Sequence, residues 1–341
     1  MRQTSKPIEQ STIKFEIPDS GAASSTIEES NVMATSPPLL TFAGEFSKPS
    51  NNKFQKLEKL KTLYFEHSRG LNSLIYLEKL DKLIICDKTK CELKIILSFG
   101  NFKYQPEIHV FKHEYIKKPR ELCLGNNNDI FISEHLNDDR ILVFDVNLHY
   151  IRQIRMKSMF VDKMKIDLSD NQYLLYISDW SDNKIIVRFS ENGRFKCVIN
   201  ITGPTYVEFD SYFLYVTSFP IFSRNRATDI VEGVQKNSNC IFILNKSNYD
   251  VVKKISFDNW LGPEGLYLNN DFNIFTTASK FNRDKKESSD FFYLYEVTLD
   301  GSVVRKFKFE DNSDEETRYT YICDRYVFVC YETHLNIYRY C

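Results

Sequence analysis

Short apolar runs that end in a small or acidic residue recur along this chain, and each is followed by a run in which apolar and polar residues alternate. Five copies are clear, and a sixth, ending at Tyr331, is more degenerate. In one copy Ile130–Glu134 precedes Arg140–Asp145, and in the next Leu175–Asp179 precedes Lys184–Phe189. A repeat built from short strands and turns, with almost no helical period, is typical of a β-propeller.

The spacing of the copies predicts the number of blades. Aligned on the last residue of the second strand, the copies lie about 40 to 60 residues apart, which fits four-stranded modules with insertions. The second module predicts strands near Glu121–Leu124, Ile130–Glu134, Arg140–Asp145 and Tyr150–Met156. We therefore expect an all-β, six-bladed β-propeller. The aligned residues are Asp87, Glu134, Asp179, Ser218, Ala278 and Tyr331.

The two ends of the repeat region hold incomplete modules. The last module stops after its third strand, Leu335–Tyr340, and one unassigned strand, Leu60–Phe65, precedes the first full module. We expect a 3+1 closure, in which the N-terminal strand becomes the outer strand of the last blade. An open ring would instead leave unpaired strand edges that can template aggregation.

Residues 1–55 differ in composition from the rest of the chain. They are rich in Ser, Thr, Pro, Asn and Glu and show no lasting hydrophobic period. Such a segment buries too little apolar surface to offset its ordering entropy. It predicts a disordered N-terminal tail ahead of a propeller over residues 56–341. The alternative, that this tail is phosphorylated or docks a partner, is left open.

Composition narrows the class of protein. Hydrophobic residues make up 42% of the chain, which is enough for a sizeable core, and the net charge of −1 provides no global field for nucleic acid or membranes. No run approaches the roughly 20 apolar residues of a membrane helix, and the N-terminus lacks the apolar centre of a secretory signal. We therefore expect a cytoplasmic protein that does not bind membranes.

Candidate chemistry is sparse. The eight cysteines include no Cys-x-x-Cys pair, so free thiols are expected rather than a zinc site. Phosphate-binding glycine loops, dinucleotide fingerprints and nucleophile elbows are missing from the sequence. No metal and no other cofactor is predicted, and the oligomeric state is left open.

Two modules resemble NHL repeats. The third shows Asp179, Asp182, Lys184-Ile185 and the turn Asn192-Gly193, and the second shows Glu134, Asn137, Arg140-Ile141 and Val143-Phe144. The resemblance covers about residues 70 to 341. NHL propellers occur in tripartite-motif ubiquitin ligases, where the ring binds protein partners or RNA. This chain has no RING-like or B-box-like cysteine and histidine cluster, so ligase activity is not implied.

The repeat alignment predicts one decorated face. Loops between second and third strands open on the same face of a propeller as the junctions between blades. Two insertions, Phe219–Asn239 and Ser279–Phe291, replace such loops in blades 4 and 5. Long loops on a rigid scaffold often carry binding, and arginine and aromatic anchors are typical of interface hot spots. The candidate partner-binding residues on this face are Lys117, Lys118, Arg120, Trp180, Arg224, Arg226, Trp260, Arg283 and Lys285. Packing roles for the tryptophans and charge-balanced, solvated loops remain alternatives.

Three functions stay open, in this order. The first is a non-catalytic scaffold that binds a protein or peptide. The second is binding of single-stranded RNA through clustered cations and exposed aromatic rings. The third is a metal-dependent hydrolase that resembles six-bladed lactonases and regucalcin, with a metal held in the central channel. For that reading Glu121, Glu208 and Glu264 lie near inner strands, but no Asn or Asp completes a ligand set.

Overall fold

Each blade is built from short antiparallel strands that are rich in β-branched and aromatic residues, and strands that follow one another in the sequence pair with one another. The computed structural model describes residues 57–65, 68–98, 106–134, 140–156, 161, 163–168, 173–179, 184–201, 203–218, 240–257, 261–269, 273–282, 287–309, 319–323 and 325–340. The predicted disordered tail, residues 1–55, lies outside these ranges. Residues 52–341 form a unit separate from residues 1–51, and the fold below is that of the former.

The first three blades are four-stranded and run from the inner to the outer strand. In blade 1 a one-turn 3-10 helix, η1 (Glu78–Leu80), joins the first strand to the second. In blade 2 the same connection is a tight turn, η2 (Asn126–Asn128), in which Asn127 and Asn128 have positive φ. Blade 1 holds β2 (Leu71–Leu77), β3 (Lys82–Asp87), β4 (Glu92–Leu97) and β5 (Ile108–Phe111). Blade 2 holds β6 (Pro119–Leu124), β7 (Ile130–Glu134), β8 (Arg140–Phe144) and β9 (Tyr150–Arg155). Blade 3 holds β10 (Lys163–Asp167), β11 (Leu174–Asp179), β12 (Lys184–Phe189) and β13 (Phe195–Asn200).

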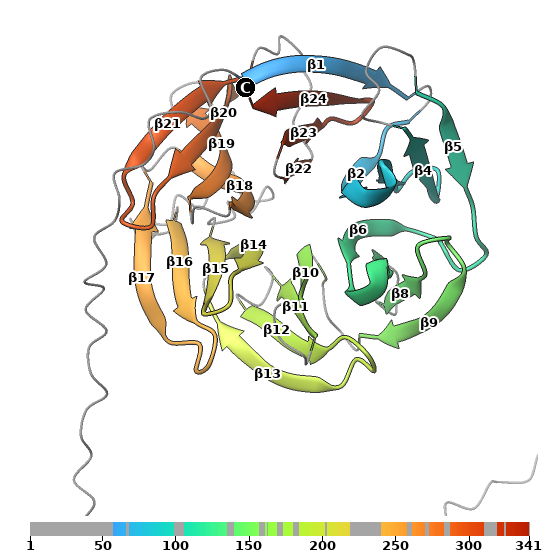
Figure 1. The fold of residues 1–341 in the computed structure, drawn as a ribbon, viewed down its shortest axis with the longest axis horizontal. Coiled ribbons are helices and arrows are strands. Elements are labelled where there is room, and N and C mark those ends of the chain that lie inside the picture. Colours follow the sequence, from blue (N-terminus) through green and yellow to red (C-terminus); the bar gives the residue numbers. More distant parts are fainter. Residues whose placement is uncertain are drawn as a thin grey trace, which may run out of the picture. The chain divides into compact units, whose positions relative to one another are not determined.

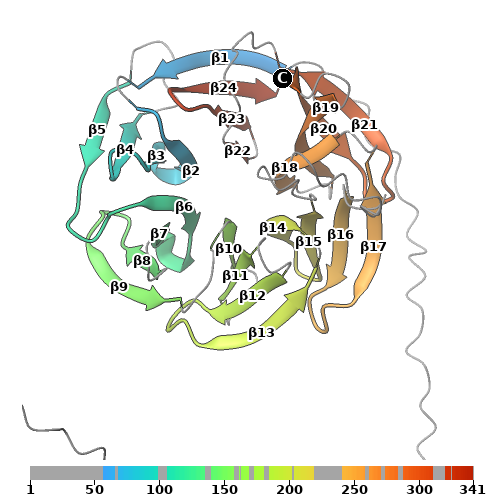
Figure 2. The same cartoon turned by 180° about the vertical axis from the view of Figure 1, so that it is seen from behind.

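The other three blades complete a ring in which the first strand of each blade lies innermost (Figure 1). Figure 2 shows the same ring from behind. Blade 4 holds β14 (Pro204–Phe209), β15 (Phe213–Ser218), β16 (Cys240–Asn245) and β17 (Val251–Ser256). Blade 5 holds β18 (Leu261–Leu268), β19 (Ile274–Asn282), β20 (Glu287–Val297) and β21 (Val303–Lys308). Blade 6 holds β22 (Tyr319–Ile322), β23 (Tyr326–Cys330), β24 (His334–Tyr340) and β1 (Leu57–Tyr64). The predicted six-bladed propeller is confirmed.

The 3+1 closure is also confirmed. Strand β1 pairs antiparallel with β24, so that Leu63 faces Leu335 and Tyr64 faces His334. The Tyr64 and His334 rings lie 5.5 Å apart between centroids. The chain therefore completes its last blade with its first described strand, and no unpaired edge breaks the ring at this point.

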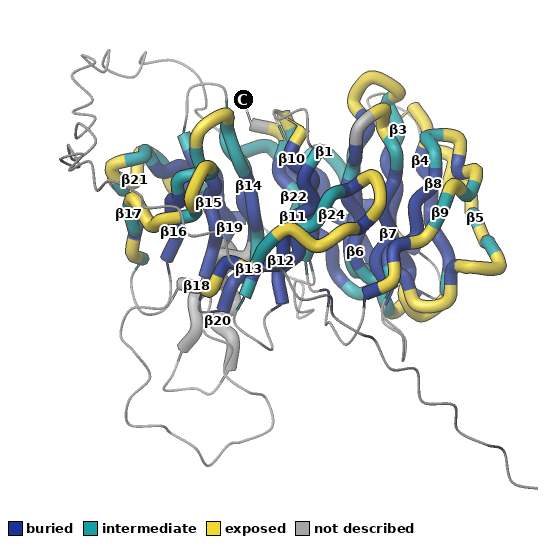
Figure 3. The backbone as a smooth tube through the Cα atoms, turned by 90° about the horizontal axis from the view of Figure 1, so that it is seen from below, coloured by how far each residue is buried: buried dark blue, intermediate teal, exposed yellow. Residues whose placement is uncertain are grey.

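The core lies between blades rather than inside one of them. Successive side chains of a strand point to opposite faces, and in a propeller both faces of the middle strands are covered by neighbouring blades. On β3, Leu83 and Ile85 pack toward blade 6, whereas Ile84 and Cys86 pack toward blade 2. This explains why β3 is a continuous apolar run. Exposed residues gather on turns and on outer strands such as β5 and β17 (Figure 3).

One expected loop is largely a hairpin. The predicted insertion Ser279–Phe291 is occupied by extensions of β19 and β20, which pair Phe281 with Ser288 and Asn282 with Glu287. The sequence of these extensions is polar and charged, so it shows no alternation of apolar residues that would predict a strand. The other insertion, Phe219–Asn239, lies between β15 and β16 as expected, but outside the described residues. Within the described part of the chain, no helix has the length and apolarity needed to cross a membrane.

Candidate functional site

A buried carboxylate holds the junction that enters blade 2. Glu134, at the end of β7, is 1% exposed. Its Oε1 accepts the backbone N–H groups of Lys117 and Lys118, the latter at 3.2 Å. Its Oε2 accepts the guanidinium Nε of Arg140 at 2.7 Å. The acidic residue of the repeat thus fixes the backbone of the blade junction and leaves the two lysine side chains exposed on the face that carries the junctions.

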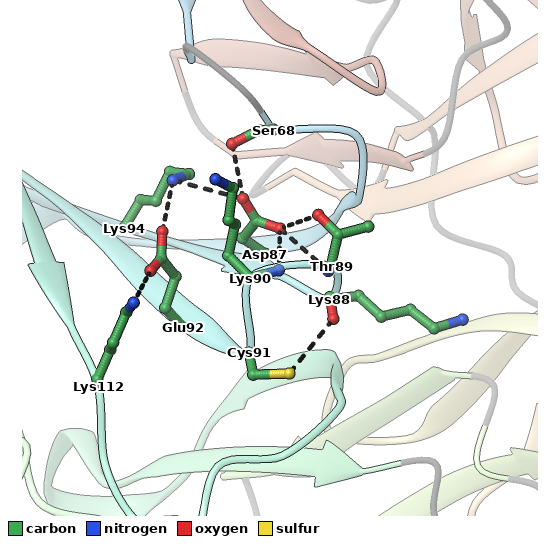
Figure 4. Close-up of polar contacts among 9 residues, drawn as sticks. All are labelled: Ser68, Asp87, Lys88, Thr89, Lys90, Cys91, Glu92, Lys94 and Lys112. Atoms are coloured by element: carbon green, nitrogen blue, oxygen red, sulfur yellow. Dashed lines mark hydrogen bonds and ion pairs between the residues drawn. The ribbon is translucent and has the colours of Figure 1, made fainter.

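A second buried carboxylate, that of Asp87 at the end of β3, holds the junction that enters blade 1 (Figure 4). Its carboxylate accepts the Ser68 hydroxyl at 2.6 Å, the Thr89 hydroxyl at 2.7 Å and the Lys90 N–H at 3.0 Å. The Lys94 ammonium lies 3.4 Å from it. Burial opposes the charge on Asp87, but these hydrogen bonds and Lys94 outweigh it, so the pKa of Asp87 lies below its ordinary value. Ser68 precedes β2, so this contact also fixes a junction.

Three cations beside these anchors lie close enough to interact electrostatically, and we call Lys88, Lys118 and Arg120 the basic patch. Lys88 and Lys118 are exposed and Arg120 is half-buried. The protein around Lys88 removes part of the hydration of its ammonium group and so lowers its pKa, and the positive charges of Arg120 and Lys118 lower it further. Asn72 on β2 donates its side-chain amide to the Arg120 carbonyl at 2.6 Å and joins the two blades. The patch is therefore a local concentration of positive charge on a rigid support.

Three of the predicted partner-binding residues are placed by the structure. Lys118 and Arg120 belong to the basic patch, and Lys117 is exposed beside them. Lys88 was not among the predicted residues, although it follows Asp87 in the second-to-third-strand turn of blade 1. The rule that places second-to-third-strand loops on this face covers this turn, but one lysine in a short turn is no signal until its neighbours from blade 2 are known. The other predicted residues lie outside the described residues: Trp180, Arg224, Arg226, Trp260, Arg283 and Lys285.

The central channel carries two lysine–glutamate pairs. Lys163 and Lys165 project from β10 into a cavity of about 230 Å³ lined by inner strands. The Lys163 Nζ lies 3.1 Å from Glu121 Oε2 on blade 2, and the Lys165 Nζ lies 2.8 Å from Glu208 Oε2 on blade 4. Lys163 also lies over the Tyr319 ring, 4.0 Å from its centroid. One inner strand thus makes ion pairs with both of its neighbours.

These ion pairs involve two of the three glutamates that the sequence offers as ligands of a metal in the channel. Glu121 and Glu208 each have an ammonium group within hydrogen-bonding distance, and a divalent cation at either carboxylate would have to displace or repel it. The side chain of Glu264 lies outside the described residues. Among the side chains that the structure describes, no group of three or more His, Cys, Asp or Glu residues is arranged to hold a metal ion.

Comparison with known proteins defines the fold. No family model matches the chain, and no curated protein matches it in sequence. A gluconolactonase from Xanthomonas campestris superimposes with a TM-score of 0.57 at 10% identity, over 84% of this chain and 89% of that chain. Selenomethionine-substituted virginiamycin B lyase from Staphylococcus aureus gives a TM-score of 0.52 at 10% identity, over 84% and 99% of the two chains. Hydrazine synthase from Kuenenia stuttgartiensis gives 0.55 at 12% identity, over 78% and 75%. At such identities the likeness establishes a shared β-propeller fold and no activity.

Proposed function

We propose that this protein is a non-catalytic interaction scaffold that binds an acidic segment of a protein partner on the junction-bearing face of its propeller. The observation that carries the proposal is the basic patch, whose three positive charges interact. Its backbone is fixed at each residue: the Lys118 N–H donates to Glu134, the Lys88 N–H donates to the Gly70 carbonyl, and the Arg120 carbonyl accepts the Asn72 side chain. A fixed cluster of like charges has a cost in the free protein that a ligand of opposite charge relieves.

Two further features support a scaffold. Blades 2 and 3 resemble NHL repeats, and NHL rings bind protein partners or RNA. The inner carboxylates Glu121 and Glu208 are paired with lysines rather than left to act on a substrate. We also propose a reducing location such as the cytoplasm, because the seven cysteines among the described residues are all free thiols.

The test measures binding of a fluorescein-labelled ten-residue polyglutamate peptide to the full chain by anisotropy at low salt. We expect the double variant K88E/K118E to bind at least tenfold more weakly. The matched control K79E/K196E changes the same charge at two exposed lysines that are not on this face. Equal affinities of the two double variants would refute the assignment to the basic patch.

Single-stranded RNA is the second candidate, because phosphates are also attracted by clustered Lys and Arg. A ten-nucleotide oligouridine in the same assay separates the two ligands. Tighter binding of the RNA, with a steep loss of affinity as salt rises and the same sensitivity to K88E/K118E, would replace the acidic peptide by RNA as the ligand.

A further inference from the structure

A pocket of about 190 Å³ lies on the opposite side of the ring from the basic patch, where first strands turn into second strands. It is formed by blades 5, 6 and 1, and we call it the tyrosine pocket. Four tyrosines from β2, β18, β22 and β23 supply most of its walls. The lining residues are Tyr76, Glu78, Tyr267, Tyr321, Cys323, Arg325 and Tyr326.

A buried phenylalanine fixes three of the rings. Phe328 on β23 is 0% exposed, and its ring centroid lies 5.8 Å from that of Tyr76, 6.1 Å from Tyr321 and 6.0 Å from Tyr326. The Tyr76 and Tyr326 rings stand at 88° to each other, 6.0 Å apart. Two perpendicular walls packed on one buried ring form a preorganised corner, so little side-chain entropy remains to be lost on binding.

Two carboxylates lie near this corner. The Tyr76 hydroxyl donates to Asp81 Oδ1 at 3.1 Å, which helps to fix the orientation of the ring. Glu78, on the same turn, is exposed and lines the pocket. Burial raises the pKa of Tyr76 and that of Tyr321, so both rings are neutral phenols near neutral pH. Aromatic faces with a carboxylate nearby attract cations.

The size and polarity of the tyrosine pocket narrow the class of cation. Its volume is below the roughly 300–1,000 Å³ of clefts that hold drug-sized ligands, so it suits the end of one side chain. A free lysine ammonium is strongly hydrated and needs hydrogen-bond acceptors, whereas a methylated ammonium presents an apolar shell to ring faces. The lining side chains supply four aromatic rings and, besides the tyrosine hydroxyls, a single carboxylate, that of Glu78.

We propose that the tyrosine pocket binds the trimethylammonium head of a methylated lysine side chain. Tyr76, Tyr321 and Tyr326 provide ring faces for the methyl groups, and Glu78 balances the charge at the rim. The site is independent of the basic patch, because it lies on the other face of the ring and recognises the opposite charge. Arg325 also lines the pocket, and its positive charge disfavours a bound cation. The competing hypothesis is therefore that the pocket binds an anion.

Calorimetric titration of the full chain with Nα-acetyl-trimethyllysine amide tests the proposal. We expect saturable binding that is about 2- to 30-fold tighter than that of the neutral isostere in which a tert-butyl group replaces trimethylammonium. Unmethylated lysine amide is expected to bind more weakly than the trimethylated probe. Absence of saturable binding by the probe, or equal affinity for the neutral isostere, would overturn the proposal.

Variants then locate the site. Y326A removes one wall and is expected to lower affinity for the probe at least tenfold, whereas Y326F keeps the ring and stays within about twofold of the wild type. Y212A, at a tyrosine that is 74% exposed, is the matched control and leaves binding unchanged. If Y326A does not fold, E78Q, on an exposed turn, still weakens binding and R325A strengthens it. Phosphate binding that R325A abolishes, with no effect of E78Q on the trimethyllysine probe, would identify an anion site instead.

Discussion

Glu134 and Asp87 occupy the same position in neighbouring blades, and the carboxylate of each is engaged by donors of its own blade and of the junction that enters it. Glu134 accepts two N–H groups of a junction and pairs with Arg140, while Asp87 accepts Ser68, Thr89 and Lys90. A buried carboxylate is tolerated because it is hydrogen-bonded on both oxygens and faces a cation. The acidic residue that ends a second strand is thus a structural anchor, and the exposed lysines that it positions are the candidate binding groups.

Replacing Glu134 with Ala is therefore expected to lower the free energy of unfolding by about 3 kcal/mol, because two backbone donors and the Arg140 guanidinium lose their acceptor. E134Q, which keeps one acceptor oxygen, is expected to lose less. The control E191A changes an exposed turn residue and is expected to stay within about 0.5 kcal/mol of the wild type. Urea unfolding followed by circular dichroism measures all three, and a loss for E134A no larger than that for E191A would contradict the anchoring role.

The pKa of Asp87 predicts a pH dependence. Its folded-state pKa lies below the ordinary value of 3.8, so its contribution to stability is complete above that value and is lost as the pH falls through the folded-state pKa. The stability difference between the wild type and D87N is therefore expected to be largest near pH 5 and to shrink toward pH 3. Urea midpoints at both pH values test this, and a difference that grows on acidification would show that the sign is wrong.

At the scale of elements, the repeat signature marks contacts between strands and between blades. Arg140 and Lys184 begin the third strands of blades 2 and 3, and each lies across from the acidic residue that ends the second strand. The turn Asn192-Gly193 brings blade 3 against the outer strand of blade 2, where a Cβ on Gly193 would collide with the Ile154 side chain. Gly193 also has a φ of +70°, a conformation that favours glycine.

We expect G193A to lower the free energy of unfolding by about 2 to 4 kcal/mol, since left-handed backbone strain and a collision with Ile154 add together. Gly301 is the matched control: its φ is +95°, but the nearest side-chain atom to an added Cβ, on Ile255, lies 3.4 Å away. G301A is expected to cost about 1 to 2 kcal/mol, from backbone strain alone. Thermal and urea unfolding compare the two variants. An equal loss of stability would show that the collision with Ile154 does not contribute to the effect of G193A.

At the scale of the whole propeller, stability depends on closing the ring. Each interface between neighbouring blades buries its own apolar cluster, and the cluster between blades 6 and 1 includes Leu63 and Phe65 beside Leu335 and Ile337. The first described strand therefore contributes to the last blade and to its contact with blade 1. In such a ring the loss of one outer strand exposes both an edge and part of an interface.

Deletion of residues 1–64 is expected to lower the melting temperature strongly or to prevent folding, because it removes β1 from β24. Deletion of residues 1–51 leaves β1 in place and is expected to keep the wild-type melting temperature within a few degrees. A chain that ends at residue 330 lacks β24 and is expected to behave like the first deletion. Cooperative melting of either strand-deleted protein at the full-length temperature would contradict the role of closure.

Much of the architecture could be predicted because it is local. The second-strand ends at Asp87, Glu134, Asp179 and Ser218 were located to the residue, since apolar runs bounded by turn residues define strands directly. The hairpin extension of β19 and β20 could not be predicted, because a polar ladder carries no hydrophobic period. Lys88 and the tyrosine pocket were missed for another reason: their neighbours come from different blades.

The sequence by itself determined the strands, their grouping into six modules and the need to complete the last one with an N-terminal segment, because alternation and turn residues act over a few positions along the chain. Only the tertiary structure decided that Lys88 lies beside Lys118 and Arg120, that Glu121 and Glu208 are paired with lysines of β10, and that tyrosines from β2, β18, β22 and β23 share one pocket. Side chains far apart in sequence become neighbours only when the ring closes, and the charges and rings that neighbour a group decide what it can bind.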